Sequence, residues 1–425
     1  MEILIKDGYL IDPKSGREGK YDILIEGNIV KKIMKFIKKP SSDTHIIDAK
    51  GKIVFPGLID IHCHLREPGR EDEETIYTGS LSAVSAGFTT ICCMPNTEPP
   101  LDNKVAIRFI YDRAKDALCE VLPIGCVTLK REGEFLSPLG EMAEEGAVGF
   151  SDDGNCIMNS LVMRRALEYT KLIEKPIISH PEDQNLTKNG VMNEGALSTK
   201  LGLGGIPRES EEIMVLRDIT LSNLTGGKLH LAHITISEAI EYIRRAKKKN
   251  KNISCEVTPH HFTLTEEAVI GYNTNAKVSP PLRTKKDIEE IIEGIKDDTV
   301  DCIATDHAPH SEEEKETGFE NAPFGVIGFE TAFPLALKLV EKGISLKNII
   351  SKFTVGPAKV LGIERGEISE GKRADVVVFD LEKKWVYEKQ NIKSKSKNSP
   401  FINWELKGKV LYTISNGKIS YQEGI

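Results

Sequence analysis

The feature that most limits the fold of this chain is a regular alternation of short apolar segments with longer amphipathic ones. The apolar segments are nearly continuous, as expected for parallel strands buried on both faces. They cover residues 54–62, 89–94, 120–127, 147–150, 176–179, 228–232, 253–257 and 300–304. Helical periodicity lies between them, at residues 80–86, 161–173, 209–222, 236–249 and 285–295. Strands and helices in this order predict an α/β fold, a (β/α)8 TIM barrel.

The two ends of the chain have a different pattern. Short strand-like stretches at residues 2–5, 21–26, 28–34, 45–49, 374–379, 385–387 and 409–415 are joined by turn residues. Asn416-Gly417 is typical of a hairpin turn. We therefore predict a small β-sandwich domain formed by both termini, residues 1–53 and 363–425, beside a catalytic barrel at residues 54–362. The basic stretch 389–397 lacks interleaved aromatic residues and is interpreted as a solvated loop rather than a phosphate or nucleic-acid patch.

Bulk properties restrict the function. The chain has 425 residues and a formal net charge of −7, whereas a nucleic-acid-binding protein needs a basic surface. It has no apolar run of about 18 residues and no basic N-terminal stretch followed by an apolar one, so we expect neither a membrane span nor a signal peptide. The eight cysteines form no C-x-x-C pair and mostly lie in apolar runs. This pattern predicts buried free thiols and a reducing, cytoplasmic location.

Polar residues gather at the predicted carboxyl ends of the strands, where such barrels carry their catalytic groups. His62 and His64 end the first strand with a spacing of two, which turns both imidazoles to one face. Other strand ends carry Asn96, Asp152, Asp153, His180, His233, His260, His261, Asp306 and His307, with His310 just beyond. A single histidine at a strand end is more often a hydrogen-bonded structural residue. Of the ten histidines, however, only His45 and His230 lie clearly elsewhere, and this clustering indicates a metal site.

The residue types suggest the ion and its chemistry. Nitrogen and carboxylate ligands without thiolate favour zinc or a similar divalent ion in an open catalytic site. Cys63 lies between the two histidines and should face away from them, so we interpret it as a packing residue. Such an ion activates water and polarises a carbonyl oxygen. A carboxylate beside that water can take its proton and pass it to a leaving nitrogen, and Asp306 is our candidate for this role.

Longer motifs resemble one enzyme family. The run PGLIDIHCH at residues 56–64 resembles the opening of the amidohydrolase superfamily, and its extension LREPG at 65–69 resembles type I (long) dihydroorotases. Residues 94–97, 152–154, 257–262, 280–283, 304–310 and 322–325 resemble the same class. The resemblance runs from near residue 5 to Asn416-Gly417. No one of these motifs is decisive, but the ordered set is specific.

The resemblance implies an activity and a site. The activity is the reversible cyclisation of the small molecule N-carbamoyl-L-aspartate to L-dihydroorotate in pyrimidine (UMP) biosynthesis, with one or two zinc ions. The implied metal ligands are His62, His64, Asp153, His180, His233 and Asp306, and Asp306 is also the implied catalytic acid and base. The implied substrate contacts are His64, Arg66, Asn96, Ser279, His310, Phe324 and Gly325. Arginine, amide and imidazole groups suit a carboxylate, and the polar stretch 310–321 predicts a mobile loop over the site.

Alternatives remain at several positions. Hydantoinases, dihydropyrimidinases and allantoinases are similar to this chain but typically carry a carbamylated lysine on the fourth strand, where this chain has Asp152 and Asp153 and no lysine. Arg66 has an ion pair with a neighbouring glutamate as its alternative. Ser279 replaces the asparagine usual in the family, so its substrate contact is an open point. We interpret His260 and His261 as orienting other ligands rather than binding metal.

Two wider questions also stay open. Some members of this class resemble inactive subunits that organise aspartate transcarbamoylase, but those lose metal ligands that this chain keeps. The sequence does not decide the number of ions, whether the protein is a homo-oligomer, or whether it associates with aspartate transcarbamoylase. We expect no nucleic-acid partner and no membrane partner.

Overall fold

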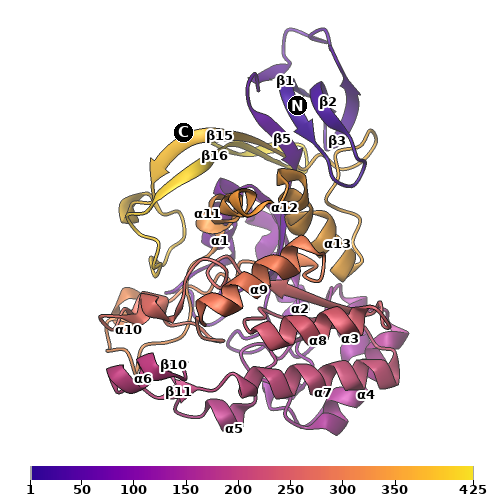
Figure 1. The fold of residues 1–425 in the computed structure, drawn as a ribbon. Helices are drawn as coiled ribbons and strands as arrows, with labels where there is room; N and C mark the ends of the chain where they lie inside the picture. The colour runs from indigo at the N-terminus through magenta and orange to yellow at the C-terminus, as the bar shows by residue number, and fades with distance from the viewer. Residues whose placement is uncertain (1, 425) are drawn as a thin grey trace.

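The computed structural model describes residues 2–424 and contains a barrel of parallel strands below a sheet built from both ends of the chain (Figure 1). The barrel strands are β6 (Leu58–Cys63), β7 (Phe88–Cys93), β8 (Glu120–Pro123), β9 (Ile177–Ser179), β12 (Leu229–Leu231), β13 (Ile253–Val257) and β14 (Cys302–Ile303). Between β8 and β9, Phe150 forms parallel bridges to Gly125 and Ile177 and takes the place of the fourth strand. Cys63 bridges His307, which closes the ring between β14 and β6. The predicted (β/α)8 barrel is therefore confirmed.

The described residues form thirteen α-helices, and the longer ones cover the outside of the barrel (Figure 1). They are α1 (Ile76–Ser85), α2 (Lys104–Arg113), α3 (Leu139–Glu144), α4 (Ser160–Leu172), α5 (Gln184–Thr187), α6 (Ala196–Leu201), α7 (Glu209–Thr225), α8 (Ser237–Lys247), α9 (Lys285–Lys296), α10 (Glu312–Lys315), α11 (Phe329–Ala336), α12 (Leu346–Phe353) and α13 (Val355–Leu361). Each predicted helical segment overlaps one of them. In α9, for example, a capping box of Thr284 and Asp287 starts the helix, and Ile291 and Ile295 are buried against the strands.

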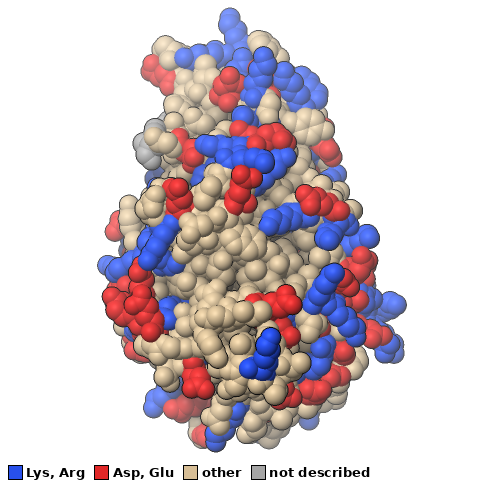
Figure 2. Space-filling view, turned by 60° about the vertical axis from the view of Figure 1, so that its left-hand side comes forward, with Lys and Arg blue, Asp and Glu red and all other residues tan. Residues whose placement is uncertain are grey.

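Short elements occupy the loops at the mouth and the rim. The strands β10 (Met192–Asn193) and β11 (Gly205–Ile206) pair with each other. Short 3-10 helices lie at Ala114–Asp116, Leu129–Arg131, Glu266–Val269, Thr274–Ala276, Leu337–Lys342 and Lys389–Asn391. Figure 2 brings forward the side that carries α6 and α10 in Figure 1; uncharged atoms fill the centre of this face and charged side chains lie mostly around it.

The two ends of the chain build one sheet with the strand order β17-β16-β15-β5-β1-β2-β3, in which β4 pairs with β1. The bounds are β1 (Glu2–Ile11), β2 (Glu18–Glu26), β3 (Ile29–Met34), β4 (His45–Asp48), β5 (Ile53–Pro56), β15 (Val376–Val386), β16 (Glu405–Ser415) and β17 (Lys418–Gln422). Ile3, Val54, Val376 and Ile414 from both ends share one hydrophobic core, which confirms the predicted β-sandwich of the two termini. The predicted turn at Asn416-Gly417 joins β16 to β17.

Several predicted segments differ from the structure. Residues 54–62 form not one strand but the ends of two, because Gly57 separates β5 of the terminal sheet from β6 of the barrel. A Cβ atom on Gly57 would lie 2.1 Å from Oγ1 of Thr89, so the chain can cross between the two sheets only without a side chain there. Residues 147–150 make only the bridges at Phe150. The stretch 385–387 is not a separate strand, since Trp385 belongs to the long strand β15.

The interpretation of residues 389–397 as a solvated loop is wrong in part. Lys393 and Lys395 are exposed, whereas Ser394 and Ser396 between them are buried. The serines face inward with a spacing of two because their hydroxyl groups bond to Glu74 and to the carbonyl oxygen of Glu73. The segment thus lies against the barrel loops. Within residues 2–424, no helix combines the length and the apolar character needed to cross a membrane.

Candidate metal centre

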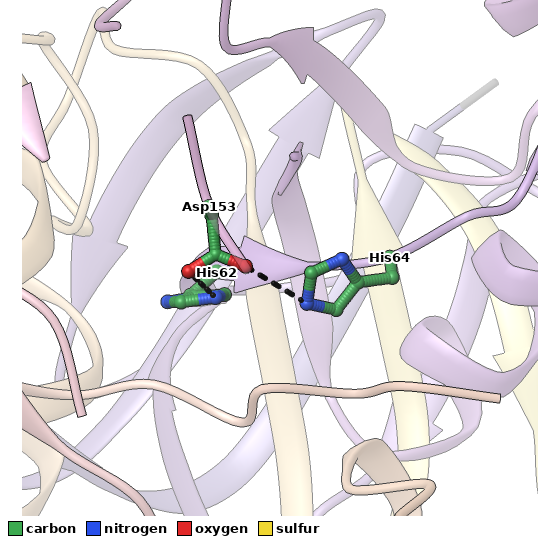
Figure 3. Close-up of side chains that lie close together, drawn as sticks. All are labelled: His62, His64 and Asp153. Carbon is green, nitrogen blue, oxygen red and sulfur yellow. Dashed lines mark ion pairs between the residues drawn. The ribbon is translucent and has the colours of Figure 1, made fainter. Parts of the chain in front are cut away.

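Three buried side chains from two strand ends meet at the mouth of the barrel (Figure 3). His62 and His64 leave the end of β6 on the same face, and Asp153 follows Phe150 at the fourth strand position. The Nε2 atom of His62 lies 3.4 Å from Asp153 Oδ1, and the Nε2 atom of His64 lies 3.6 Å from Asp153 Oδ2. One possible ligand atom from each residue lies within 4.8 Å of the others. This spacing suits a single cation held by all three.

Asp153 also belongs to a second group of possible ligands. His180 follows β9 and His233 follows β12. The Nδ1 atom of His180 and the Nε2 atom of His233 each lie 3.5 Å from Asp153 Oδ1 and 2.9 Å from each other. The ligand atoms of this group also lie within 4.8 Å of one another. The carboxylate of Asp153 therefore stands between two possible cation positions and is placed to bridge them.

Unpartnered atoms test whether this cluster fits a metal ion. Among the described residues, His62 Nε2 and Asp153 Oδ1 are buried without a hydrogen-bond partner. Buried polar atoms are almost always partnered, because an unsatisfied one loses its hydration without replacement. Imidazole nitrogen and carboxylate oxygen are the donors that zinc and similar divalent ions accept. The donor set and its two unpartnered atoms fit a divalent metal ion.

The sequence did not single out Glu256, which orients His62 in the structure. Glu256 lies on β13 inside the barrel, and its Oε1 accepts a hydrogen bond from His62 Nδ1 at 2.6 Å. Its Oε2 lies 3.1 Å from His230 Nε2. A carboxylate on the far ring nitrogen fixes the tautomer of a histidine and leaves the other nitrogen free for a metal. The available signal was a lone acidic residue inside the apolar strand 253–257.

His64 and His180 are held in the same way. Asn96 Oδ1 accepts a hydrogen bond from His64 Nδ1 at 2.8 Å, so Asn96 orients a possible ligand. His180 turns Nδ1 to the cluster and its Nε2 lies 3.1 Å from Oε2 of the buried Glu182. Ser279 donates to the same carboxylate oxygen at 2.7 Å. Sequence reasoning missed Glu182, whose signal was the spacing of two from His180.

Asp306 lies at the edge of the first group. Its Oδ1 is 3.1 Å from His64 Nε2 and 3.6 Å from His62 Nε2. Its φ of +47° is unusual for a residue with a side chain, and its backbone N–H donates to the carbonyl oxygen of His62 at 3.0 Å. Burial raises the pKa of Asp306, but the hydrogen bond from His64 and the charge of His62 outweigh it and hold the pKa below its ordinary value. The carboxylate is therefore ionised beside the possible cation position.

Asp152 faces away from the cluster. Its Oδ1 accepts hydrogen bonds from the backbone N–H groups of Val127 and Thr128 at 2.9 and 3.1 Å, and its Oδ2 accepts one from the Thr128 hydroxyl. Adjacent residues of an extended chain point to opposite sides. The structure thus brings Asp153 and not Asp152 to the possible ligands, while Asp152 anchors the loop after β8.

Arg66 and His310 lie together next to this cluster. Nη2 of Arg66 is 3.1 Å from Nε2 of His310, and the ring Nδ1 of His310 is 2.8 Å from Glu73 Oε1. Arg66 Nε lies 3.1 Å from Glu73 Oε2 and donates to the Pro309 carbonyl at 3.0 Å. Arg66 therefore forms the ion pair with a nearby glutamate that was its alternative. Burial and the charge of Arg66 lower the pKa of His310 well below its ordinary value.

The backbone of Phe324 and Gly325 also has protein partners. The Phe324 carbonyl oxygen lies 2.8 Å from His310 Nε2, and the Gly325 N–H donates to the Lys277 carbonyl at 2.9 Å. Gly325 has a φ of +141°, and a Cβ there would lie 2.8 Å from the Cβ of Ala308. The segment is thus pressed against the loop after β14 and needs glycine at this position.

The adjacent histidines on the loop after β13 differ. His261 is bonded at both nitrogens, to the Thr258 hydroxyl at 2.7 Å and to the Pro280 carbonyl at 2.8 Å. In the described part of the chain, Nε2 of the buried His260 has no hydrogen-bond partner. Burial lowers the pKa of His260 to about 4, so its ring is neutral. Neither histidine belongs to a possible ligand group in the described chain.

The loop 310–321 is packed against neighbouring loops. Lys315 is buried and donates to the carbonyl oxygens of Thr274 and Pro323 at 2.9 and 2.8 Å. Lys277 is buried and donates to the carbonyl oxygens of Phe319 and Glu320 at 2.7 and 2.9 Å. Burial lowers the pKa of Lys315 to about 7. This arrangement is thus held by lysine-to-backbone bonds, and the mobility of the loop stays a prediction.

The structure has possible cation positions at the mouth of a (β/α)8 barrel, with an ionised aspartate beside them. This arrangement is typical of amidohydrolase enzymes. Comparisons agree with this class. Residues 223–421 match the model of the Amidohydrolase family, and residues 51–239 match the model described as Dihydro-orotase-like. The chain belongs to the dihydroorotase family.

Relatives that align along the full length of this chain support this assignment. The chain is 50% identical to the dihydroorotase of Endomicrobium trichonymphae, over 99% of this chain and 100% of that protein. It is 47% identical to the dihydroorotase of Syntrophus aciditrophicus, over all of both chains. Among solved structures, the L-hydantoinase of Arthrobacter aurescens matches with a TM-score of 0.89 at 24% identity, covering 100% of this chain and 96% of that chain. At that identity the structural match shows the fold alone.

Proposed function

We propose that this protein is a dihydroorotase, which interconverts N-carbamoyl-L-aspartate and L-dihydroorotate in pyrimidine biosynthesis. Asp153 is the observation that carries the proposal. Related hydantoinases use a modified lysine on the fourth strand, and residues 149–153 of this chain include no lysine. An unmodified aspartate lies there instead, within 3.4–3.6 Å of nitrogen atoms from four histidines.

The proposed cofactor is zinc, with two ions per subunit. His62, His64, Asp153 and Asp306 would hold one ion, and Asp153, His180 and His233 would hold the other. Metal ions so held would supply an activated water and a polarised substrate carbonyl. Glu256, Asn96 and Glu182 support this proposal because each occupies the second nitrogen of a ligand histidine.

The side chains of this protein have separate roles in the proposed reaction. Asp306 is the acid and base: its carboxylate takes a proton from the attacking water and delivers it to the amide nitrogen that leaves when the ring opens. In the reverse direction the same carboxylate removes a proton from the ureido nitrogen. Arg66 and His310 bind the carboxylate of the substrate, which would exchange for part of the contact between Arg66 and Glu73. We keep His64, Asn96, Ser279, Phe324 and Gly325 as further proposed substrate contacts.

Substrate preference tests the proposal. The purified protein, loaded with zinc, is assayed by chromatography on L-dihydroorotate, N-carbamoyl-L-aspartate, allantoin and hydantoin. We expect turnover of the first two in opposite directions and little of the others. The Asp306→Asn protein, purified in parallel, reports any contaminating host enzyme. Turnover of allantoin or hydantoin alone would refute the proposal.

The cellular location, the domain boundaries and the assembly of the enzyme are also proposals. The eight cysteines in residues 2–424 are buried free thiols, which supports a reducing, cytoplasmic location. We propose the division into residues 1–53, 54–362 and 363–425, although β5 (Ile53–Pro56) extends the terminal sheet slightly past the first boundary. Formation of a homo-oligomer and association with aspartate transcarbamoylase stay predictions.

A further inference from the structure

The connection between β15 and β16 leaves the terminal sheet and reaches the loops at the mouth of the barrel (Figure 1). Alternate residues of this connection face the barrel. The Ser394 hydroxyl donates to Glu74, and the Ser396 hydroxyl donates to the Glu73 carbonyl at 2.7 Å. Asn398 comes next with the same spacing and is 3% exposed. A segment 88 residues beyond His310 thus lies against the loop that carries it.

Asn398 uses its whole side-chain amide to join two separate loops. Its Oδ1 accepts a hydrogen bond from the backbone N–H of His310 at 3.0 Å. Its Nδ2 donates to the carbonyl oxygens of Ala308 and Gly325 at 3.0 and 3.1 Å. Its backbone carbonyl accepts from the N–H of Ile327 at 3.0 Å. An amide offers two N–H donors and a carbonyl acceptor, and here both kinds are used in a buried setting.

The loops joined in this way carry the proposed carboxylate-binding groups. His310 lies beside Arg66 at 3.1 Å, and its ring also meets the carbonyl of Phe324 at 2.8 Å. The position of the His310 ring therefore depends on two backbone segments that Asn398 holds together. Removing the amide leaves a buried N–H and two buried carbonyls without this partner, and such groups move toward new partners or water.

We propose that Asn398 is a positioning residue for substrate recognition, which fixes His310 and Gly325 without itself contacting the reacting atoms. This inference rests on the proposed function of Arg66 and His310 as carboxylate-binding groups. It assigns to the C-terminal part of the chain a direct influence on the barrel site. The bonds of Asn398 reach none of the proposed metal ligands, so its effect should fall on binding and not on the metal.

The Asn398→Ala variant tests this role through steady-state kinetics in both directions. We expect KM for each substrate to rise about tenfold, as for the loss of a well-made buried hydrogen bond, with kcat changed less than about threefold and zinc content unchanged. The matched control is Ser399→Ala. Ser399 is a buried neighbour whose hydroxyl accepts from the N–H of Phe401 in the same segment. An unchanged KM in Asn398→Ala, or an equal rise in Ser399→Ala, would overturn the inference.

Two further measurements separate this inference from the proposed function. In the background of His310→Ala, the Asn398→Ala change should raise KM by clearly less than in the wild type, since part of its effect acts through His310; fully additive effects would contradict the proposed route. Amide hydrogen exchange of peptides covering residues 306–327 should be faster in Asn398→Ala than in wild type or Ser399→Ala. If the wild-type protein converts neither substrate, the proposed function fails, and hydrogen exchange alone tests the positioning role. Unchanged protection of residues 306–327 in Asn398→Ala would then reject that role.

Discussion

Each histidine near the first possible cation position has a hydrogen-bond partner on its far nitrogen. Glu256 serves His62, and Asn96 serves His64. These partners fix the ring orientation and the tautomer before any ion arrives, which lowers the entropy lost on binding. Asp306 differs from these histidines. Its Oδ1 lies near Nε2 of both His62 and His64, and among the described residues it has no second carboxylate as a partner. We therefore propose that the oriented histidines hold an ion, and that Asp306 both binds the ion and moves a proton.

The change Asp306→Asn tests the proposed role of Asp306 in proton transfer. Asparagine keeps the size of the side chain but cannot accept a proton at neutral pH, so we expect kcat to fall about 10²–10⁴-fold in both directions. The thermal midpoint should stay near that of the wild type, which circular dichroism measures. Activity close to normal would contradict the acid and base role of Asp306.

The change Glu256→Gln tests the support of His62. The amide would place a hydrogen-bond donor against His62 or His230, both of which now meet a carboxylate. We expect the zinc dissociation constant to rise about 10–100-fold, and excess zinc to restore most of the activity. Competition with a chromophoric chelator measures the constant. Glu120→Gln is the control, because Glu120 pairs with Arg365 and Arg373 away from the cluster; a constant equal to that of wild type in Glu256→Gln would reject the role.

At the scale of elements, the junction between β5 and β6 is tightly constrained. The chain passes from the terminal sheet to the barrel within one residue, at Gly57. The Gly57 N–H donates to the Asp375 carbonyl at 2.9 Å, and the side chain of Thr89 fills the space where a Cβ would stand. Because β6 carries His62, a shift of this junction would displace the first possible ligand.

The change Gly57→Ala therefore has a defined outcome. The added methyl group overlaps Thr89 Oγ1, at 2.1 Å from the ideal Cβ position, and we expect a loss of about 1–3 kcal/mol in the free energy of unfolding. Urea denaturation measures it. Gly195→Ala is the control, because its Cβ would meet only Asn193 Nδ2 at 4.0 Å. Equal stability of the two variants would show that the junction accepts a side chain.

At the scale of the whole molecule, the possible ligands come from widely separated parts of the barrel. His62 stands on the first strand, Asp153 at the fourth position and His180 and His233 after the fifth and sixth. An ion that binds them ties these strands together and binds only the folded state. Bound metal should therefore stabilise the entire barrel.

Removal of metal tests this coupling. Dialysis against a chelator should abolish turnover and lower the thermal midpoint of unfolding, and added zinc should restore both. With free zinc at about 100 times its dissociation constant, the free energy of unfolding should be about 3 kcal/mol higher than without zinc. His45→Ala is a control, because His45 lies on β4 in the terminal sheet, and it should respond to chelation as wild type does. A thermal midpoint unaffected by the chelator would contradict the coupling.

The sequence alone was enough to predict the barrel, the terminal β-sandwich and the residues of the two possible cation groups. Periodicity shows which segments are strands, and strand ends of a barrel converge at one mouth, so a metal site at the strand ends that carry His62 and His64 follows from local pattern and topology. The individual ligands on the other strands were implied by the family resemblance. The choice of Asp153 over Asp152 rested on the family resemblance, and the structure places only Asp153 in the cluster.

Only the tertiary structure revealed the partners that arrive from distant parts of the chain. Glu256 looks like one acidic residue in a strand, and residues 389–397 look like a solvated loop, until folding sets them against His62 and the loops at the mouth. Such contacts depend on packing between segments far apart in the sequence, and local periodicity carries no information about them. The local pattern and the family resemblance therefore predicted which side chains gather at the mouth of the barrel, while long-range packing decided which partners hold each of them in place.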